Sequence, residues 1–164
     1  MKIVIVGAGK VGYSLAQRLI QDDHDVYVID RSPERIQNLE NTLDVSLVQG
    51  NGSDVQLLDE IGMSDVGMFI AVTDSDEVNM LSCAVAKITG VPTTIARVRD
   101  NSVAEHMDAE MRAKLGVDLF INLKWLQLKN YYKYLKLHLP LMLKTLVKVQ
   151  CALWSLNLLR SSLC

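Results

Sequence analysis

The chain of 164 residues has only three cysteines, and none stands in a CxxC or CxxH arrangement. This scarcity argues against a zinc site and a disulfide framework, and it favours a reducing cytoplasmic compartment. No uncharged apolar stretch reaches the roughly 18 residues of a membrane-spanning helix, so we expect no membrane span. Met1 and Lys2 lead directly into a strand-like run, so we expect no signal peptide. The net charge of −2 argues against nucleic acid as a partner.

Acidic residues and glycine are both absent from the C-terminal part of the chain. The last acidic residue is Asp118 and the last glycine is Gly116. Residues 1–122 hold ten basic and all 19 acidic residues, a net charge of −9, whereas residues 123–164 hold seven basic residues and no acidic one, a net charge of +7. We therefore divide the chain into a domain at 1–122 and an atypical Leu/Lys-rich tail at 123–164.

Apolar runs typical of buried strands alternate with segments of helical periodicity in the first part. The six strand-like runs lie at residues 2–6, 26–30, 45–48, 68–72, 93–98 and 118–121. Strands alternating with helices at this spacing predict a parallel sheet with right-handed crossovers. The predicted fold is α/β: a Rossmann-like, doubly wound, six-stranded parallel sheet, followed by the basic tail.

The last two helices of this domain are predicted from the spacing of their apolar residues. The apolar stripe of the fourth helix consists of Met80, Leu81, Ala84, Val85 and Ile88. A single fifth helix is expected to carry Val103, Met107, Met111 and Leu115. We expect these residues to face the core.

A glycine-rich turn, Gly7-Ala8-Gly9-Lys10-Val11-Gly12, follows the first strand. The first glycine permits a tight turn, the second lets backbone N–H groups approach a diphosphate, and the third allows close helix–strand packing. The positive end of the following helix favours an anion. A preceding strand, a following helix and an acid about 20 residues further on support a nucleotide site. The alternative is a structural turn that has lost its ligand.

The acid in question is Asp30, at the end of the second strand-like run. A carboxylate at this place accepts hydrogen bonds from ribose hydroxyls and repels a 2′-phosphate. We therefore favour NAD(H) or an adenine nucleotide over NADP(H). Arg31 weakens this preference slightly, because a guanidinium can pair with phosphate.

Ligands of such sheets bind beyond the carboxyl ends of the strands, so the residues that follow the other strands complete the predicted site. Asn51 and Gly52 lie in a polar turn after the third strand that can line a site for adenine or ribose. Thr73 and Asp74 stand at the start of the segment after the fourth strand. Arg97 lies within an apolar strand, where an arginine is costly unless it meets an anion or a carboxylate. It is therefore predicted to contact a phosphate or a second subunit, and the alternative is an ordinary salt bridge.

No catalytic group is evident beside this predicted site. His24 stands in an acidic turn, His106 in the predicted fifth helix and His138 in the tail, whereas Cys83 lies within an apolar helix stripe. Asp74, Asp76 and Glu77 could form a cation site, but acidic residues in the first turn of a helix are ordinary capping chemistry. The residues thus favour a sensor over a hydride-transfer enzyme, which needs a proton-transfer group beside the nicotinamide.

Residues 1–122 resemble the nucleotide-binding domain of the Trk-type potassium uptake regulators (the TrkA, or RCK/KTN, family). The matching stretches are Gly7–Gly12, Asp30, Val48–Ser53, Ile70–Met80, Ile95–Arg99 and Leu115–Asp118. The most specific of them is the pattern A-V-T-x-x-D-E-x-N, which dehydrogenases do not usually show.

The resemblance implies a cytoplasmic regulatory subunit, peripheral at the inner face of the cell membrane, that binds NAD(H) or ATP/ADP and gates a potassium transporter membrane subunit. It implies that the phosphates rest on Gly7 to Val11, that the ribose binds Asp30, and that Thr73, Asp74 and Arg97 also line the site. Paired subunits, in a homodimer or higher homo-oligomer, would transmit the ligand's effect. The alternative function is a nicotinamide-dependent oxidoreductase fragment that lacks its substrate domain.

The resemblance ends after Asn122, where family members typically continue as Asn-Pro-Glu into a crossing helix and a small C-terminal ligand domain. Residues 123–129 can be encoded so that a reading frame shifted by one base gives Pro-Glu-Met-Val-Thr-Ala-Lys. We therefore hypothesise that a base has been lost near codon 122. The alternative is a genuine tail whose lysines and leucines form a cationic amphipathic helix for anionic lipid or an acidic partner.

The nucleotide sequence tests the frameshift hypothesis. Inserting one base near codon 122 should open a frame that restores the missing acidic residues and glycines. If no one-base correction opens a family-like continuation, the hypothesis is wrong. Binding to anionic liposomes that disappears on deletion of residues 123–164 would support the genuine tail.

Overall fold

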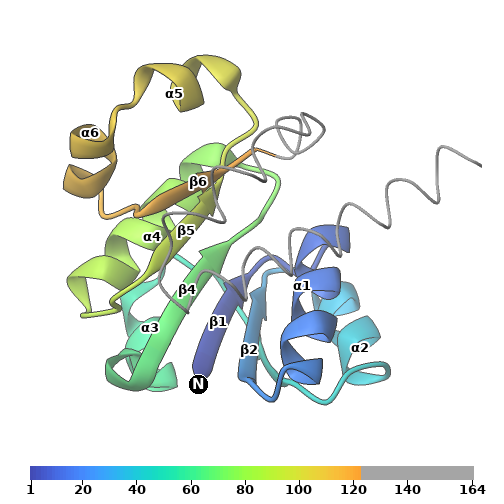
Figure 1. Ribbon diagram of the computed structural model, residues 1–164. Coiled ribbons are helices and arrows are strands. Elements are labelled where there is room, and N and C mark those ends of the chain that lie inside the picture. Colours follow the sequence, from blue (N-terminus) through green and yellow to red (C-terminus); the bar gives the residue numbers. More distant parts are fainter. Residues whose placement is uncertain (123–164) are drawn as a thin grey trace, which may run out of the picture. The chain divides into compact units, whose positions relative to one another are not determined.

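The computed structural model describes residues 1–122, which form a six-stranded parallel sheet with flanking helices (Figure 1). The predictions for residues 123–164 lie outside the described residues. The strands are β1 (Lys2–Val6), β2 (Asp25–Asp30), β3 (Ser46–Gln49), β4 (Val66–Ala71), β5 (Thr94–Arg97) and β6 (Leu119–Ile121). The helices are α1 (Lys10–Gln21), α2 (Pro33–Glu40), α3 (Val55–Ile61), α4 (Asp76–Ile88), α5 (Asn101–His106) and α6 (Ala109–Lys114), with a 3₁₀ turn, η1, at Met63–Asp65.

The sheet has the strand order β3-β2-β1-β4-β5-β6, and every neighbouring pair is parallel. The chain first moves outward from β1 to β3 and then returns to β4 on the other side of β1. Right-handed crossovers that run in opposite directions place their helices on opposite faces of the sheet. This confirms the predicted Rossmann-like, doubly wound fold. The reversal beside β1 is the switch point at which such sheets bind ligands.

The core lies around β1 and β4 at the centre of the sheet. Ile3, Val4, Ile5 and Phe69 are completely buried, and Ile70 is 1% exposed. Both faces of these strands are covered by helices, so their sequences are apolar at consecutive positions instead of alternating. The six predicted strands all occur, with ends that differ by no more than two residues from the predicted runs.

The single fifth helix predicted from the apolar spacing is wrong. The segment forms two short helices, α5 and α6, separated by Met107 in an extended conformation (φ −84°, ψ 106°). The Asp108 carboxylate accepts a hydrogen bond from the Met111 N–H at 2.8 Å and so begins a new helix. This N-cap explains the break, because an Asp that satisfies the N–H groups of the following turn competes with helix continuation.

The buried face of α4 also differs from the predicted apolar stripe. Leu81 is 55% exposed and Ile88 is 86% exposed, whereas Asn79, Ser82 and Cys83 face the core. The small side chains on this face allow the helix to lie close to β4 and β5. A polar residue is tolerated there because Asn79 forms hydrogen bonds with backbone groups at the ends of these strands. Hydropathy alone therefore misplaced Leu81 and Ile88, whereas the predicted Met80 and Val85 do pack against the core.

The turn between β1 and α1 depends on two glycines. Gly7 has a φ of +106°, in a region that side chains rarely allow, and a Cβ there would lie 3.0 Å from the Thr73 nitrogen. A Cβ on Gly12 would collide with the carbonyl oxygen of Gly7. The first turn of α1 therefore packs directly against the end of β1, which fixes where the helix begins.

We expect Gly12→Ala to lower the free energy of unfolding by at least about 2 kcal/mol, because either the helix or the turn must move to admit the methyl group. Urea unfolding measures this change. The matched control is Gly9→Ala, since Gly9 has an ordinary φ of −72° and its nearest neighbour would be Arg35 Nη1 at 4.0 Å. The control should cost less than about 1 kcal/mol; equal losses in the two variants would contradict the packing argument.

Candidate functional site

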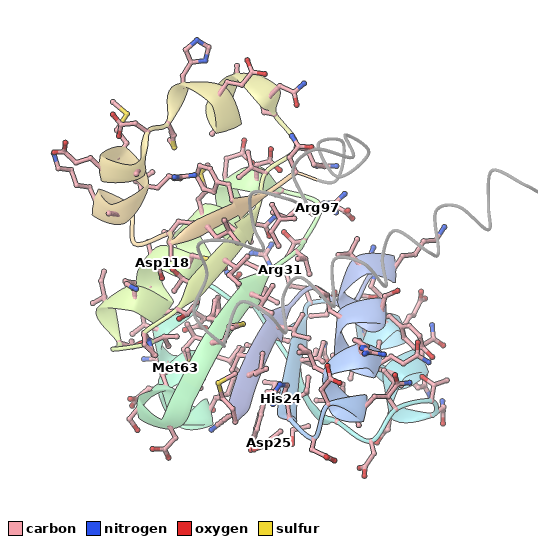
Figure 2. All side chains as sticks on the ribbon, in the orientation of Figure 1. His24, Asp25, Arg31, Met63, Arg97 and Asp118 are labelled. Atoms are coloured by element: carbon pink, nitrogen blue, oxygen red, sulfur yellow. The ribbon has the colours of Figure 1, made fainter. Side chains whose placement is uncertain are left out.

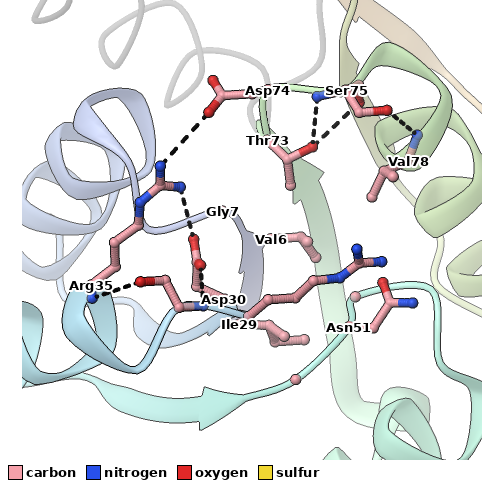
Figure 3. Close-up of a pocket in the computed structure, with 14 residues that line it drawn as sticks. Val6, Gly7, Ile29, Asp30, Arg35, Asn51, Thr73, Asp74, Ser75 and Val78 are labelled. Carbon is pink, nitrogen blue, oxygen red and sulfur yellow. Dashed lines mark hydrogen bonds and ion pairs between the residues drawn. The ribbon is translucent and has the colours of Figure 1, made fainter.

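A cavity of about 420 Å³ opens at the carboxyl ends of the central strands (Figure 3). Seven of the predicted site residues line it: Gly7, Asp30, Arg31, Asn51, Gly52, Thr73 and Asp74. The other lining residues are Val6, Ile29, Ser32, Arg35, Gly50, Ser75 and Val78. This size is typical of a site for a small organic ligand.

The other predicted residues of the glycine motif follow the lining residue Gly7. They form the loop before α1 and the first turn of that helix: Ala8, Gly9, Lys10, Val11 and Gly12. Gly9 is the N-cap, no side chain caps this helix end, and its first turn holds no acidic residue. Because the first N–H groups of a helix have no intrahelical acceptor, this end offers hydrogen-bond donors and partial positive charge. It is a binding place for an anion.

Asp30 links this turn to the start of α2. Its side chain is only 8% exposed, and its Oδ2 accepts a hydrogen bond from the Ala8 N–H at 2.6 Å. Its Oδ1 accepts a second bond from the Ser32 N–H at 2.8 Å. The carboxylate thus orders the protein's own turns, while each oxygen retains a further lone pair for a ligand. Its predicted bond to ribose stays a prediction.

Arg35 is a site residue that the sequence reasoning missed. Its Nη1 lies 3.6 Å from Asp30 Oδ2 and its Nη2 lies 3.7 Å from Asp74 Oδ2, so its guanidinium bridges the end of β2 and the segment after β4 (Figure 3). The sequence does contain a signal for Arg35, because Ser32-Pro33 marks the start of a helix and so places Arg35 in its first turn. Side chains in the first turn point toward the helix N-terminus, here toward the carboxyl edge of the sheet.

Arg97, at the end of β5, forms an ion pair with Asp74, with Nη1 to Oδ1 at 3.9 Å. The side chain is 17% exposed and does not line the cavity. Burial, assisted by the nearby charge of Arg99, lowers the pKa of the Arg97 guanidinium. Figure 2 shows Arg97 and Arg31 at the same end of the molecule, away from His24 and Asp25. The contact with phosphate or with a second subunit stays a prediction.

Thr73 is held by Asn79, a fully buried residue of α4 whose role the sequence reasoning also missed. Asn79 Oδ1 accepts hydrogen bonds from the Thr73 N–H at 2.8 Å and from Thr73 Oγ1 at 2.7 Å. Asn79 Nδ2 donates to the carbonyl oxygen of Arg97 at 2.9 Å. One amide therefore joins the ends of β4 and β5, and fixes the wall of the cavity.

Asp76 and Glu77, in the first turn of α4, form hydrogen bonds with the protein itself. Ser75 caps α4, and its hydroxyl donates to Glu77 Oε2 at 2.7 Å, which lowers the pKa of that exposed carboxyl. Asp76 Oδ2 accepts the N–H groups of Arg99 and Asp100 at 2.8 and 2.9 Å. It thus secures the turn after β5 and does not cap its own helix. Within residues 1–122 no group of three His, Cys, Asp or Glu side chains is placed to hold a metal ion.

The two histidines and the cysteine of the described part of the chain do not line the cavity. His24 precedes β2, at the amino edge of the sheet, and His106 ends α5. Burial raises the pKa of the Cys83 thiol to about 12, so it remains protonated. His138 lies outside the described residues. No helix in the described region is both long enough and apolar enough to cross a bilayer.

Comparison with known proteins gives matches over this same region. A Trk system potassium uptake protein TrkA of Azorhizobium caulinodans is 43% identical over 119 residues, 72% of this chain and 25% of that protein. A TrkA homolog of Methanothermobacter thermautotrophicus is 38% identical over 122 residues, 74% of this chain and 54% of that protein. The chain therefore spans about a quarter to a half of the length of these relatives.

Solved structures show the same fold at lower identity. The NAD(P)-binding domain of an exopolyphosphatase-related protein from Archaeoglobus fulgidus has a TM-score of 0.67 at 19% identity, covering 82% of this chain and 96% of that one. The GsuK channel bound to NAD has a TM-score of 0.65 at 21% identity, covering 80% of this chain and 23% of that one.

The strand order, the glycine turn and the cavity beside it together define a Rossmann-like domain of the nucleotide-binding class. Residues 3–123 match the family described as the TrkA-N domain. The chain belongs to the TrkA-N family.

We expect Asn79→Ala to lower the free energy of unfolding by about 2–4 kcal/mol, because it empties a fully buried position and takes the Asn79 partner from partly buried backbone groups of Thr73 and Arg97. Thermal or urea unfolding measures the change. Ser82→Ala is the matched control on the same buried face: among the described residues the Ser82 hydroxyl is buried without a hydrogen-bond partner. The control should be neutral or slightly stabilising. If Ser82→Ala lowered the free energy of unfolding as much as Asn79→Ala does, the loss would reflect any change on this helix face. It could then not be assigned to the hydrogen bonds of Asn79.

Proposed function

We propose that residues 1–122 are the nucleotide-binding domain of a cytoplasmic regulatory subunit of a membrane potassium uptake system, with NAD(H) or ATP/ADP as the ligand. The single observation that carries the binding proposal is the uncapped, positive end of α1 beside the cavity at the switch point of the sheet. The nearly buried Asp30 stands at the end of the adjacent strand, where a carboxylate can accept hydrogen bonds from ribose hydroxyls.

The choice of ligand rests on Asp30 and on the structural neighbours. A carboxylate at this position disfavours a 2′-phosphate, so NAD(H) is preferred over NADP(H). The GsuK channel has been solved bound to NAD and bound to ADP. These neighbours are only 21% identical to this chain, so they support a nucleotide in general. The choice between a dinucleotide and an adenine nucleotide is therefore left to the binding experiment.

The regulatory role rests on the relatives, which are named Trk system potassium uptake proteins. The described part of the chain adds a cavity without a lysine or histidine in its lining, as suits a domain that binds a nucleotide without reacting with it. A potassium transporter membrane subunit would be the partner. A homodimer or higher homo-oligomer would transmit the effect, because a sensor requires two states to which the ligand binds unequally.

We also propose that the domain ends at residue 122 and that residues 123–164 form a basic tail, which is either the product of a frameshift or genuine. Residues 123–164 would replace the crossing helix and the C-terminal ligand domain of the family. Under the frameshift hypothesis this chain retains the binding site and loses the part that would couple it to a transporter.

Calorimetric titration of the full chain with NAD⁺, NADH, ATP and ADP tests the binding proposal. At least one nucleotide should bind, and Gly9→Ala should weaken it about tenfold or more, because the methyl group stands where a diphosphate approaches the N–H groups of α1. Since Gly9→Ala leaves the turn unstrained, its thermal unfolding should stay close to that of the wild type.

Asp30→Asn is the second variant, because it keeps an acceptor oxygen but removes the negative charge. It should reduce discrimination against a 2′-phosphate, measured as the ratio of NADP⁺ to NAD⁺ affinity. An unchanged ratio would contradict the assigned role of Asp30. Sustained oxidation of NADH with a panel of carbonyl or quinone acceptors would instead support the oxidoreductase alternative.

A further inference from the structure

The guanidinium of Arg35 lies beside the positive end of α1. Its Nη1 is 4.0 Å from the place that a Cβ of Gly9, the N-cap of that helix, would occupy. A cation at a helix N-terminus is electrostatically unfavourable, since the helix carries partial positive charge there. Two carboxylates, those of Asp30 and Asp74, offset this repulsion at 3.6 and 3.7 Å.

These two carboxylates differ in how firmly they are held. Asp30 is 8% exposed, and backbone N–H groups bind both of its oxygens. Asp74 is 75% exposed, and its side chain makes only the two ion pairs, with Arg35 and with Arg97, among the described residues. The pair with Arg35 is exposed on both sides and therefore weak, and the pair with Arg97 is long, at 3.9 Å. The Asp74 carboxylate can therefore leave its place by a side-chain rotation, while the Asn79 bonds keep the backbone of Thr73 fixed.

We propose that Asp74 is an internal competitor of the ligand's diphosphate: its carboxylate occupies Arg35 in the empty site, and a bound diphosphate replaces it there. Arg35 is then a phosphate-binding residue, and Asp74 lowers the affinity for phosphate-bearing ligands. This inference rests on the proposed nucleotide site and deepens it, because it predicts which part of the ligand the acid opposes. A residue that bound the ligand directly would have the opposite effect on affinity.

The geometry gives the competition a physical basis. A guanidinium presents several N–H donors in a planar fork and pairs more strongly with a phosphate than with a distant carboxylate. The same anion also accepts hydrogen bonds from the N–H groups of α1. The Asp74 carboxylate accepts none of these bonds, since it pairs with Arg35 and Arg97 (Figure 3). The exchange therefore gains interactions on the ligand side and releases Asp74 to solvent.

Titration calorimetry of the full chain with adenosine and with ADP tests the proposal. Asp74→Asn should tighten ADP binding about threefold to tenfold, the range expected when one or two exposed ion pairs no longer compete. Adenosine affinity should stay unchanged, because adenosine has no phosphate. Arg35→Gln should weaken ADP binding, and the gain from Asp74→Asn should be largely lost in the Arg35→Gln background.

The matched control is Glu34→Gln, which removes the same charge one residue from Arg35, at an exposed position with no ion pair among the described residues. It should leave ADP affinity nearly unchanged. An equal gain in the control would overturn the proposal in favour of general electrostatics, as would an Asp74→Asn variant that binds ADP equally or less well. Failure of both wild type and Asp74→Asn to bind ADP or any other nucleotide would overturn this inference together with the proposed function, whereas normal wild-type binding without a gain overturns this inference alone.

Discussion

The contact between Gly12 and the carbonyl group of Gly7 is the constraint on which the site depends. It brings the first turn of α1 against the end of β1, so that the helix begins at the carboxyl edge of the sheet. Gly9 then leaves the helix end without a side-chain cap. A bulkier residue at Gly7 or Gly12 would move the N–H donors of α1 away from the cavity. The site would then lose the donors that can bind an anion.

Charge around this helix end is balanced by three side chains from different elements. Asp30 comes from β2, Arg35 from α2 and Asp74 from the segment after β4. Asp30 is fixed by backbone N–H groups, whereas Asp74 is exposed. The carboxylate on the β2 side is thus held in place, whereas on the β4 side the backbone is held by Asn79 and the Asp74 side chain can rotate.

Sequence patterns predicted the sheet well because buried parallel strands are continuous apolar runs that turn residues interrupt, as at 2–6 and 68–72. They were wrong for part of α4, where Asn79 faces the core and Leu81 faces outward, since hydropathy cannot show which polar group finds partners inside. The break at Asp108 was missed because a local cap overrides a helical period. Arg35 was missed because its contact with Asp74 joins α2 to the segment after β4, which lie far apart in the sequence.

Amide chemical shifts of the ¹⁵N-labelled full chain, followed during a titration with ADP or NAD⁺, test the central claim most directly. If the ligand's phosphates bind at the start of α1, the largest shifts will occur at the N–H groups of Gly9, Lys10 and Val11, with smaller shifts around Thr73. Amides at the amino edge of the sheet, such as that of Asp25, will not move. Saturable binding that leaves the first turn of α1 unshifted would contradict the account.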